Sequence, residues 1–169
     1  IAGYTSASLN GRAAKNCANY GSVTHFGITR RYTYIGGVAG YFPGNSNYYC
    51  VQNCLNYGTV SHNGTTSSSL YIGGISGSAN SFENCVSGGK VISNKVSYYA
   101  GTLSGSCSKL KNCYWADSIS YNKACGGYGS PTTAESTSFN STTFELSKAV
   151  SVYNHTKTSL VDALNAAAD

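Results

Sequence analysis

The sequence of 169 residues contains no methionine, one tryptophan and two prolines, and charged residues make up only 10% of it. A typical soluble domain carries about a quarter charged residues, and a chain poor in Leu, Glu and Lys lacks the residues that favour helices. No apolar run approaches the roughly 20 residues that a membrane-spanning helix needs. These absences argue against a helical protein and against membrane insertion of this segment.

The net charge is +5, and the few basic residues are scattered along the chain. The only neighbouring pairs are Arg30-Arg31 and Lys109 with Lys111. Nucleic-acid binding usually needs a clustered basic stripe, and no nucleic-acid partner is expected. The Gly-Gly pairs are followed by neither Lys-Ser/Thr nor a helix start, which argues against a phosphate-binding loop. No cofactor is therefore predicted.

Acidic residues are scarcer still, and Glu83 and Asp117 are the only two inside the repeat region. Glycoside hydrolysis needs two carboxylates roughly 5–9.5 Å apart. These two acids stand at different positions relative to the repeated Cys, and no acidic cluster offers a Ca²⁺ site for lysis by β-elimination. We predict no catalytic residue and keep a glycan-active β-helix enzyme domain as an alternative.

What the chain does contain is an internal repeat rich in Gly and Tyr. One block, Tyr34-Ile35-Gly36-Gly37-Val38-Ala39-Gly40, returns twice, and its tail opens the chain as Ile1-Ala2-Gly3. The last glycines of the copies, Gly3, Gly40, Gly77 and Gly105, are 37, 37 and 28 residues apart. Because the chain begins inside this motif, we expect it to be a segment of a longer protein.

A second block follows the same spacing, and its first copy is Asn16-Cys17-Ala18-Asn19-Tyr20-Gly21-Ser22-Val23. Apolar and polar residues alternate around each Cys, which predicts strands with one buried face. Stacked copies would place equivalent side chains in inward columns. The predicted columns are Cys17, Cys54, Cys85 and Cys113; Val23, Val60, Val91 and Ile119; and Ile1, Val38, Ile75 and Leu103. Asn16, Asn53, Asn84 and Asn112 are expected to stack at a corner, and the glycines to serve close packing or positive-φ corners.

We predict an all-β fold, a right-handed parallel β-helix or solenoid with one short C-terminal helix. An antiparallel sandwich or barrel is the alternative, but it does not require identical blocks at a fixed spacing. Residues 1–119 would hold the repeats, of about 28–37 residues each. Residues 120–169 would form a terminal coil, a loop around Cys125 to Gly129, and a short capping helix with Thr158 or Ser159 as its N-cap.

The seven cysteines and three histidines could form disulfides or bind a metal, or they could have a purely structural role. In-register Cys on parallel strands suit disulfide geometry poorly, so the column is expected to hold buried free thiols. A disulfide among Cys50, Cys107 and Cys125 fits an extracellular protein. His25 and His62 recur at equivalent positions and could bind a metal with a neighbouring Cys, but two polar surface residues explain them more simply, and no metal is predicted.

Fifteen tyrosines raise the question of an aromatic binding face. Rows of aromatic side chains bind sugars or proteins, whereas tyrosine also simply suits strands. The residues that could line one face are Tyr32, Tyr34, Tyr48, Tyr49, Tyr71, Tyr98 and Tyr99, with Tyr34, Tyr71 and Tyr99 at repeated positions. Three N-glycosylation sequons begin at Asn63, Asn140 and Asn154 and are compatible with secretion.

The Gly-Gly-(Val/Ile)-x-Gly and Asn-Cys-x-Asn-x-Gly-x-Val blocks resemble the GLUG-type repeats of large surface proteins of bacteria and anaerobic protists. The resemblance covers residues 1–119, and the stretch from Phe139 to Asn165 is similar to the tail that follows such repeats. The usual block carries Leu-Val where this chain has Val-Ala or Ile-Ser, and Ser where it has Cys. The resemblance implies adhesion and surface display.

The expectation is therefore a non-catalytic, extracellular or cell-surface structural and adhesive module. Its partners would be proteins or glycans at a surface, or copies of itself. A subunit of an extracellular filament or sheath is the first alternative, and the glycan-active enzyme domain is the second.

Overall fold

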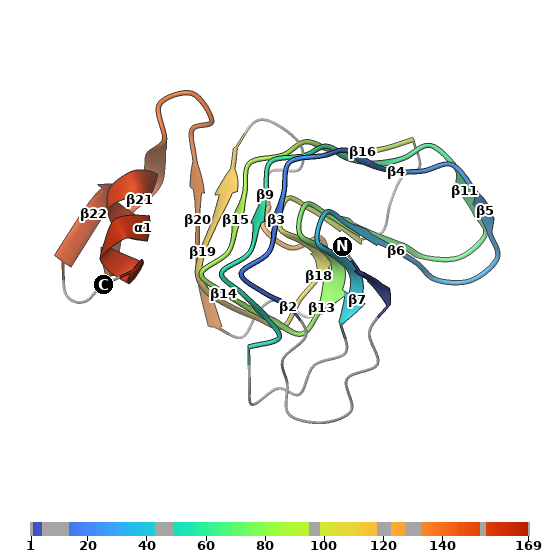
Figure 1. The fold of residues 1–169 in the computed structure, drawn as a ribbon, viewed down its shortest axis with the longest axis horizontal. Coiled ribbons are helices and arrows are strands. Elements are labelled where there is room, and N and C mark those ends of the chain that lie inside the picture. Colours follow the sequence, from blue (N-terminus) through green and yellow to red (C-terminus); the bar gives the residue numbers. More distant parts are fainter. Residues whose placement is uncertain are drawn as a thin grey trace.

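The computed structural model of the chain describes residues 2–4, 14–42, 49–94, 99–117, 123–127, 133–152 and 155–168. Within these ranges the chain is mostly β, with a single helix near the C-terminal end. The ribbons of successive repeats run alongside one another in Figure 1, coloured in turn from blue through green to yellow. The expectation of a β protein with parallel sheets and one short C-terminal helix is confirmed.

Each parallel sheet collects the equivalent strands of successive repeats. One sheet contains β1 (Ala2–Tyr4), β7 (Ala39–Phe42), β13 (Ser76–Ala79) and β18 (Ser104–Ser106), and another contains β4 (Val23–His25), β10 (Val60–His62) and β16 (Val91–Ser93). A two-stranded sheet pairs β5 (Ile28–Thr29) with β11 (Thr65–Thr66), and a further sheet contains β6 (Thr33–Gly36), β12 (Leu70–Gly73) and β17 (Tyr99–Gly101). The last sheet contains β2 (Ala14–Lys15), β3 (Ala18–Asn19), β8 (Val51–Gln52), β9 (Leu55–Asn56), β14 (Ser81–Glu83), β15 (Val86–Ser87) and β19 (Lys109–Ala116).

The strand register follows the sequence repeat residue by residue. Val60 is paired with Val23 on one side and with Val91 on the other. Phe82 lies between Val51 and Leu110 in the same way. Ile1 and Ile119, the predicted ends of two columns, lie outside the described residues. Equivalent side chains of successive repeats therefore lie next to one another across the parallel strands.

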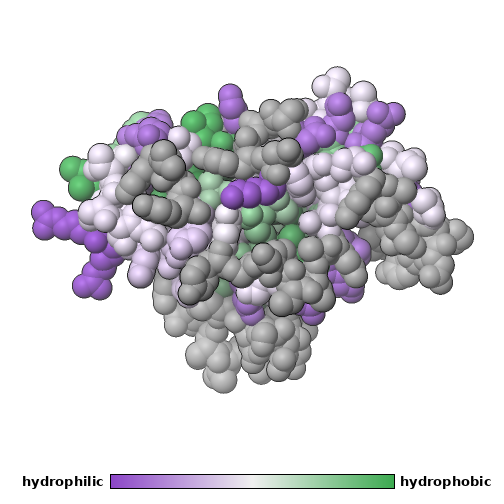
Figure 2. All heavy atoms as spheres, turned by 180° about the vertical axis from the view of Figure 1, so that it is seen from behind, coloured by the Kyte–Doolittle hydropathy of each residue, from purple (hydrophilic) through white to green (hydrophobic). Residues whose placement is uncertain are grey.

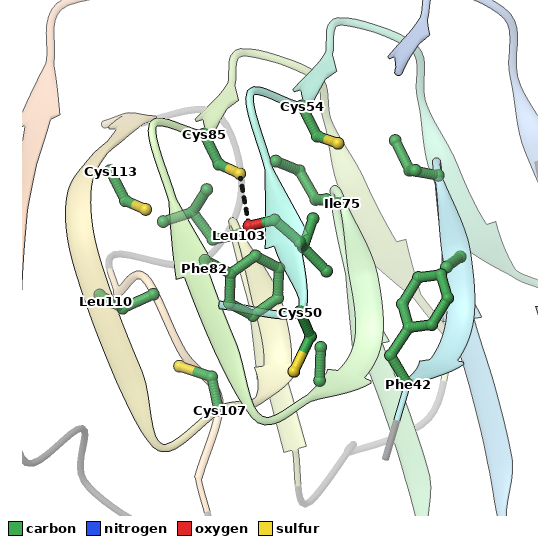
Figure 3. Packing of buried hydrophobic residues seen from close by; sticks show 14 residues of the cluster. Phe42, Cys50, Cys54, Ile75, Phe82, Cys85, Leu103, Cys107, Leu110 and Cys113 are labelled. Atoms are coloured by element: carbon green, nitrogen blue, oxygen red, sulfur yellow. Dashed lines mark hydrogen bonds between the residues drawn. The ribbon is translucent and has the colours of Figure 1, made fainter. Parts of the chain in front are cut away.

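The apolar columns pack into two clusters within the repeat region. The larger cluster combines the Cys column with the column of Phe82 and with the column of Val38, Ile75 and Leu103, as Figure 3 shows from close by. The second cluster places Val60 and Val91 against Ile35 and Ile72. Phe82, Leu103 and Cys113 are fully buried. Burial of these columns supplies the main favourable free energy of folding.

The repeated asparagines adopt the left-handed backbone conformation at the corner that precedes each Cys. The φ angles of Asn16, Asn53, Asn84 and Asn112 lie between 47° and 57°. Their amides form a directional ladder, in which Asn53 donates to Asn16 over 3.0 Å, and Asn84 donates to Asn53 over 3.2 Å. Asn tolerates this backbone better than other residues with a side chain. The repeated glycines, in contrast, show no positive φ where they are described, and they serve close packing.

Two substitutions at Asn53 should separate its backbone role from its amide role. Asn53→Ala is expected to lower the free energy of unfolding by about 2 kcal/mol, because it loses the ladder bonds and because Ala, unlike Asn, has no polar side chain that offsets the cost of the left-handed backbone. Asn53→Gly loses only the ladder bonds and should cost about half as much. Urea unfolding of both variants measures the difference. Equal losses for Ala and Gly would contradict the backbone role.

The C-terminal part adds one strand to the parallel sheet and then changes direction. Strand β20 (Thr133–Phe139) pairs in parallel with β19, although its Ser- and Thr-rich sequence gives little strand signal. Strands β21 (Glu145–Val152) and β22 (His155–Ser159) continue as antiparallel neighbours. The final element is the helix α1 (Leu160–Ala168), seen beside β21 and β22 in Figure 1. The part of the predicted loop that the structure describes, residues 125–127, is irregular apart from one isolated parallel β-bridge between Cys125 and Ser104 of β18.

The helix begins with the predicted cap. The Asp162 backbone N–H donates to the Ser159 hydroxyl over 3.1 Å, and that hydroxyl donates to the Asp162 carboxylate over 2.8 Å. The helix lies against β21 and β22, and its Leu160 and Ala163 belong to one apolar cluster with Phe139 and Tyr114. Among the described residues, no helix has both the length and the apolar character needed to cross a membrane.

Candidate functional site

Three tyrosines at equivalent repeat positions stack on the outside of β6, β12 and β17. Tyr71 is paired in register with Tyr34 and with Tyr99. Their ring centroids are 4.9 Å and 4.4 Å apart, with interplanar angles of 20° and 8°. The neighbouring Ile35 and Ile72 point into the core, so strand alternation directs the tyrosines outward. The structure brings the three predicted residues of the aromatic face together.

Two further tyrosines extend this stack into a cluster of five. Tyr41, from β7, lies 4.6 Å from Tyr34 between ring centroids. Tyr32, which precedes β6, contacts Tyr71 edge-on at 6.3 Å and Tyr34 at 6.5 Å. Tyr32 is 63% exposed and the other four rings are half-buried. We refer to Tyr32, Tyr34, Tyr41, Tyr71 and Tyr99 as the tyrosine cluster.

The stacking decides which parts of these rings a ligand can reach. Both faces of Tyr71 are occupied by neighbouring rings, so a sugar cannot stack on them as on an open aromatic platform. Burial, together with the neighbouring Tyr99, Tyr34 and Tyr32, raises the pKa of Tyr71 to about 12. Its phenol therefore stays protonated at physiological pH. The cluster offers ring edges and neutral hydroxyls that can both donate and accept hydrogen bonds.

The other tyrosines named as candidates do not all lie here. Tyr49 lies under the ammonium of Lys109, which is 4.3 Å from the ring centroid, and so belongs to the surface beside β19. Tyr48 and Tyr98 lie outside the described residues. Tyr41 was missed by the sequence analysis, although its position directly after Gly40 repeats that of Tyr4 after Gly3.

The four column cysteines are free thiols, and all but the half-buried Cys17 are fully buried. Each thiol donates a hydrogen bond to the carbonyl oxygen two residues earlier, and Cys85 also donates to the Val51 carbonyl oxygen over 3.6 Å, the dashed line in Figure 3. A hydrogen bond from the Cys85 thiol lowers the pKa of Cys54 to about 7, whereas burial raises the pKa of Cys85. Cys107 and Cys125 form a disulfide, whereas the buried Cys50 is not disulfide-bonded, and its thiol shares a 3.3 Å hydrogen bond with the Ser81 hydroxyl.

The rings of the two recurring histidines stack on one another, with His62 buried and His25 half-buried. The rings of His25 and His62 are 5.2 Å apart between centroids, with an interplanar angle of 14°. His62 is fully buried and shares a 3.0 Å hydrogen bond with the Asn94 side chain. Among the described residues, no three His, Cys, Asp or Glu side chains gather as metal ligands would. The simpler reading, two polar surface residues, fails for His62 because the adjacent repeats cover it.

This stack predicts a pH-dependent stability. Burial, and second the nearby His62, lower the pKa of His25 below its ordinary value of 6.5. The unfolded chain then binds a proton at a higher pH than the folded chain, so stability falls as the pH drops through about 6.5. We expect a lower urea midpoint at pH 5.5 than at pH 7.5. His25→Ser should flatten this dependence of stability on pH. Serine already occupies the equivalent position two repeats further along the chain, as Ser93.

An unchanged pH dependence in His25→Ser would contradict the role of His25. The carboxylate of Glu83 does not interfere, since its pKa lies below the ordinary 4.5 and therefore outside this window. Burial alone would raise the Glu83 pKa, but hydrogen bonds from Lys111 over 2.8 Å and from Gln52 over 2.7 Å outweigh it. A carboxylate held ionised in this way is a poor general acid.

The predicted glycosylation sites lie on the surface where they are described. Asn63 and Asn140 are exposed, and Asn154 lies outside the described residues. The Asn140 amide oxygen accepts hydrogen bonds from the backbone N–H groups of Thr142 and Thr143.

Comparison of the chain with known protein families, with curated proteins and with solved structures finds no match.

Proposed function

We propose that the chain is a non-catalytic structural and adhesive module of an extracellular surface protein, built as a right-handed parallel β-solenoid with one coil per repeat. The support for the coils is the register, in which each strand is paired with its equivalents one repeat away. The resemblance to GLUG-type repeats points the same way. The disulfide between Cys107 and Cys125 is typical of an oxidising compartment.

The observation that carries the adhesive role is the tyrosine cluster. Five tyrosines from four strands and one loop position contact one another on the outer surface. Tyrosine supplies contact area and hydrogen bonding at a low cost in side-chain entropy, and it is enriched in binding surfaces for this reason. Folding has already ordered these rings, so a protein or glycan partner would lose little further entropy on contact.

A binding screen against glycans and extracellular-matrix proteins tests this role. Tyr32→Ser combined with Tyr41→Ser should weaken binding at least about tenfold. Both changes copy the next repeat, which carries Ser69 and Ser78 at these positions, and should therefore preserve the fold. Tyr20→Ser is the control, because Tyr20 is exposed but lies outside the cluster. Absence of binding, or equal loss in the control, would contradict the role of the cluster.

The pairing beyond the last repeat favours a module over a filament subunit. There β19 is paired with β20, and residues 123–127 bond to the backbone of Thr102 to Ser104. End-to-end growth through these strands would need open backbone edges, and these edges are already paired.

A further inference from the structure

The first repeat exposes two large apolar side chains that folding does not require. Phe26 is 73% and Ile28 is 82% exposed. Both stand at outward positions, since His25 and Thr29 beside them are half-buried. The next repeat has the same backbone there and carries Asn63 and Thr65 instead. Figure 2, which views the molecule from behind, shows hydrophobic side chains at the end formed by β5 and β11.

Another repeat stacked on the N-terminal side would not cover these side chains. The equivalent residues of the second repeat, Asn63 and Thr65, are already covered by the first repeat on their N-terminal side, and Asn63 also has Asn94 of the third repeat beside it. Asn63 and Thr65 nevertheless remain exposed. The outward direction is therefore lateral to the stack, and whatever covers Phe26 and Ile28 must approach from the side.

The strand register places a complete glycosylation sequon beside these apolar side chains. The Asn63 backbone N–H donates to the His25 carbonyl oxygen over 2.9 Å, so Asn63 lies next to Phe26. Thr65 is the direct register partner of Ile28. Adjacent strands lie about 4.8 Å apart. The acceptor Asn63 and the Thr65 of Asn63-Gly64-Thr65 are thus both exposed, and each borders one of the two apolar side chains.

We propose that Asn63 carries an N-linked glycan whose first N-acetylhexosamine packs on Phe26 and Ile28. In the transfer, Asn63 Nδ2 bonds to the anomeric carbon of a lipid-linked oligosaccharide pyrophosphate. The bond from that carbon to the pyrophosphate oxygen breaks, the lipid pyrophosphate leaves with the electron pair, and the amide nitrogen loses one proton. The apolar CH face of the sugar then covers the Phe26 ring, which removes apolar surface of both from water.

Asn140 offers an internal comparison within the same chain. Its sequon is also exposed, but the amide oxygen is held by the backbone N–H groups of Thr142 and Thr143, over 2.8 Å and 3.1 Å. A glycan at Asn140 would report that the chain has passed through the glycosylating compartment. The inference rests on the extracellular location in the proposed function, but not on any binding by the tyrosine cluster.

The test is to secrete the full chain from a eukaryotic cell and to map the glycans by mass spectrometry. An endoglycosidase that leaves one sugar on Asn prepares the protein for thermal unfolding. We expect Asn63 to be occupied and the single sugar to raise the Tm by about 2–4 °C over the unglycosylated Asn63→Gln and Thr65→Val variants. Phe26→Asn, the residue of the next repeat, should keep the occupancy and lose the gain in Tm.

Two results would overturn the inference. One is a secreted chain with Asn63 unmodified, whether or not Asn140 is glycosylated. The other is a gain in Tm that is the same with Phe26 and with Asn at position 26. Either result leaves the adhesive role open, because the tyrosine cluster is tested by binding and involves neither Asn63 nor Phe26.

Discussion

Phe82→Ala is expected to lower the free energy of unfolding by about 3–5 kcal/mol. The Phe82 side chain is fully buried between Val51 and Leu110 of the adjacent repeats. In Figure 3 its ring lies at the centre of the larger apolar cluster, beside Leu103. Truncation removes the buried ring and leaves a cavity, which the paired strands on both sides prevent from closing.

Urea unfolding measures this loss, and Phe26→Ala is the matched control. It is the same substitution at a side chain that is 73% exposed, so its effect should stay within about 0.5 kcal/mol. Phe82→Leu, which keeps most of the buried volume, should fall between the two. Similar losses for Phe82→Ala and Phe26→Ala would mean that the column of Phe82 is not part of the core.

The repeat region could be predicted from the sequence because the blocks repeat at matching positions. Aligning the copies of Asn-Cys-x-Asn already pairs Val60 with Val23 and Val91, and parallel stacking then follows from the need of each repeat to bury its apolar face. Asn at the corner was predicted from its amide, whereas its left-handed backbone was not, because the glycines were the more obvious carriers of positive φ.

The candidate site could be predicted only in part. The sequence spacing puts Tyr34, Tyr71 and Tyr99 in one row, but Tyr41 reaches Tyr34 only because the chain turns between β6 and β7. No repeat position reveals that approach. Strand β20 was missed for a different reason: its pairing partner β19 stabilises it, and its own Ser- and Thr-rich sequence carries little apolar alternation.

Gly73→Ala is expected to cost about 3 kcal/mol, the upper end of what overpacking a core usually costs, and to lower the Tm by roughly 10 °C. Gly73 ends β12, where the chain turns towards β13. An added Cβ would meet the Ser104 Cα and the Ser76 carbonyl oxygen, and would lie 2.7 Å from the Ser104 carbonyl carbon. All three atoms belong to the backbone, so no side-chain rotation can relieve the overlap and the paired strands must separate.

Gly21→Ala is the matched control for this substitution. The nearest atom to a Cβ at Gly21 is the Asn19 Oδ1 at 3.8 Å, the residue is exposed, and its backbone is not in the left-handed region. Its effect should lie within about 0.5 kcal/mol, since Ala also restricts the unfolded chain. Thermal unfolding of both variants decides the matter: comparable Tm values would show that β12 and β18 do not approach closely at Gly73, and the tight stacking of adjacent repeats would then lose its support.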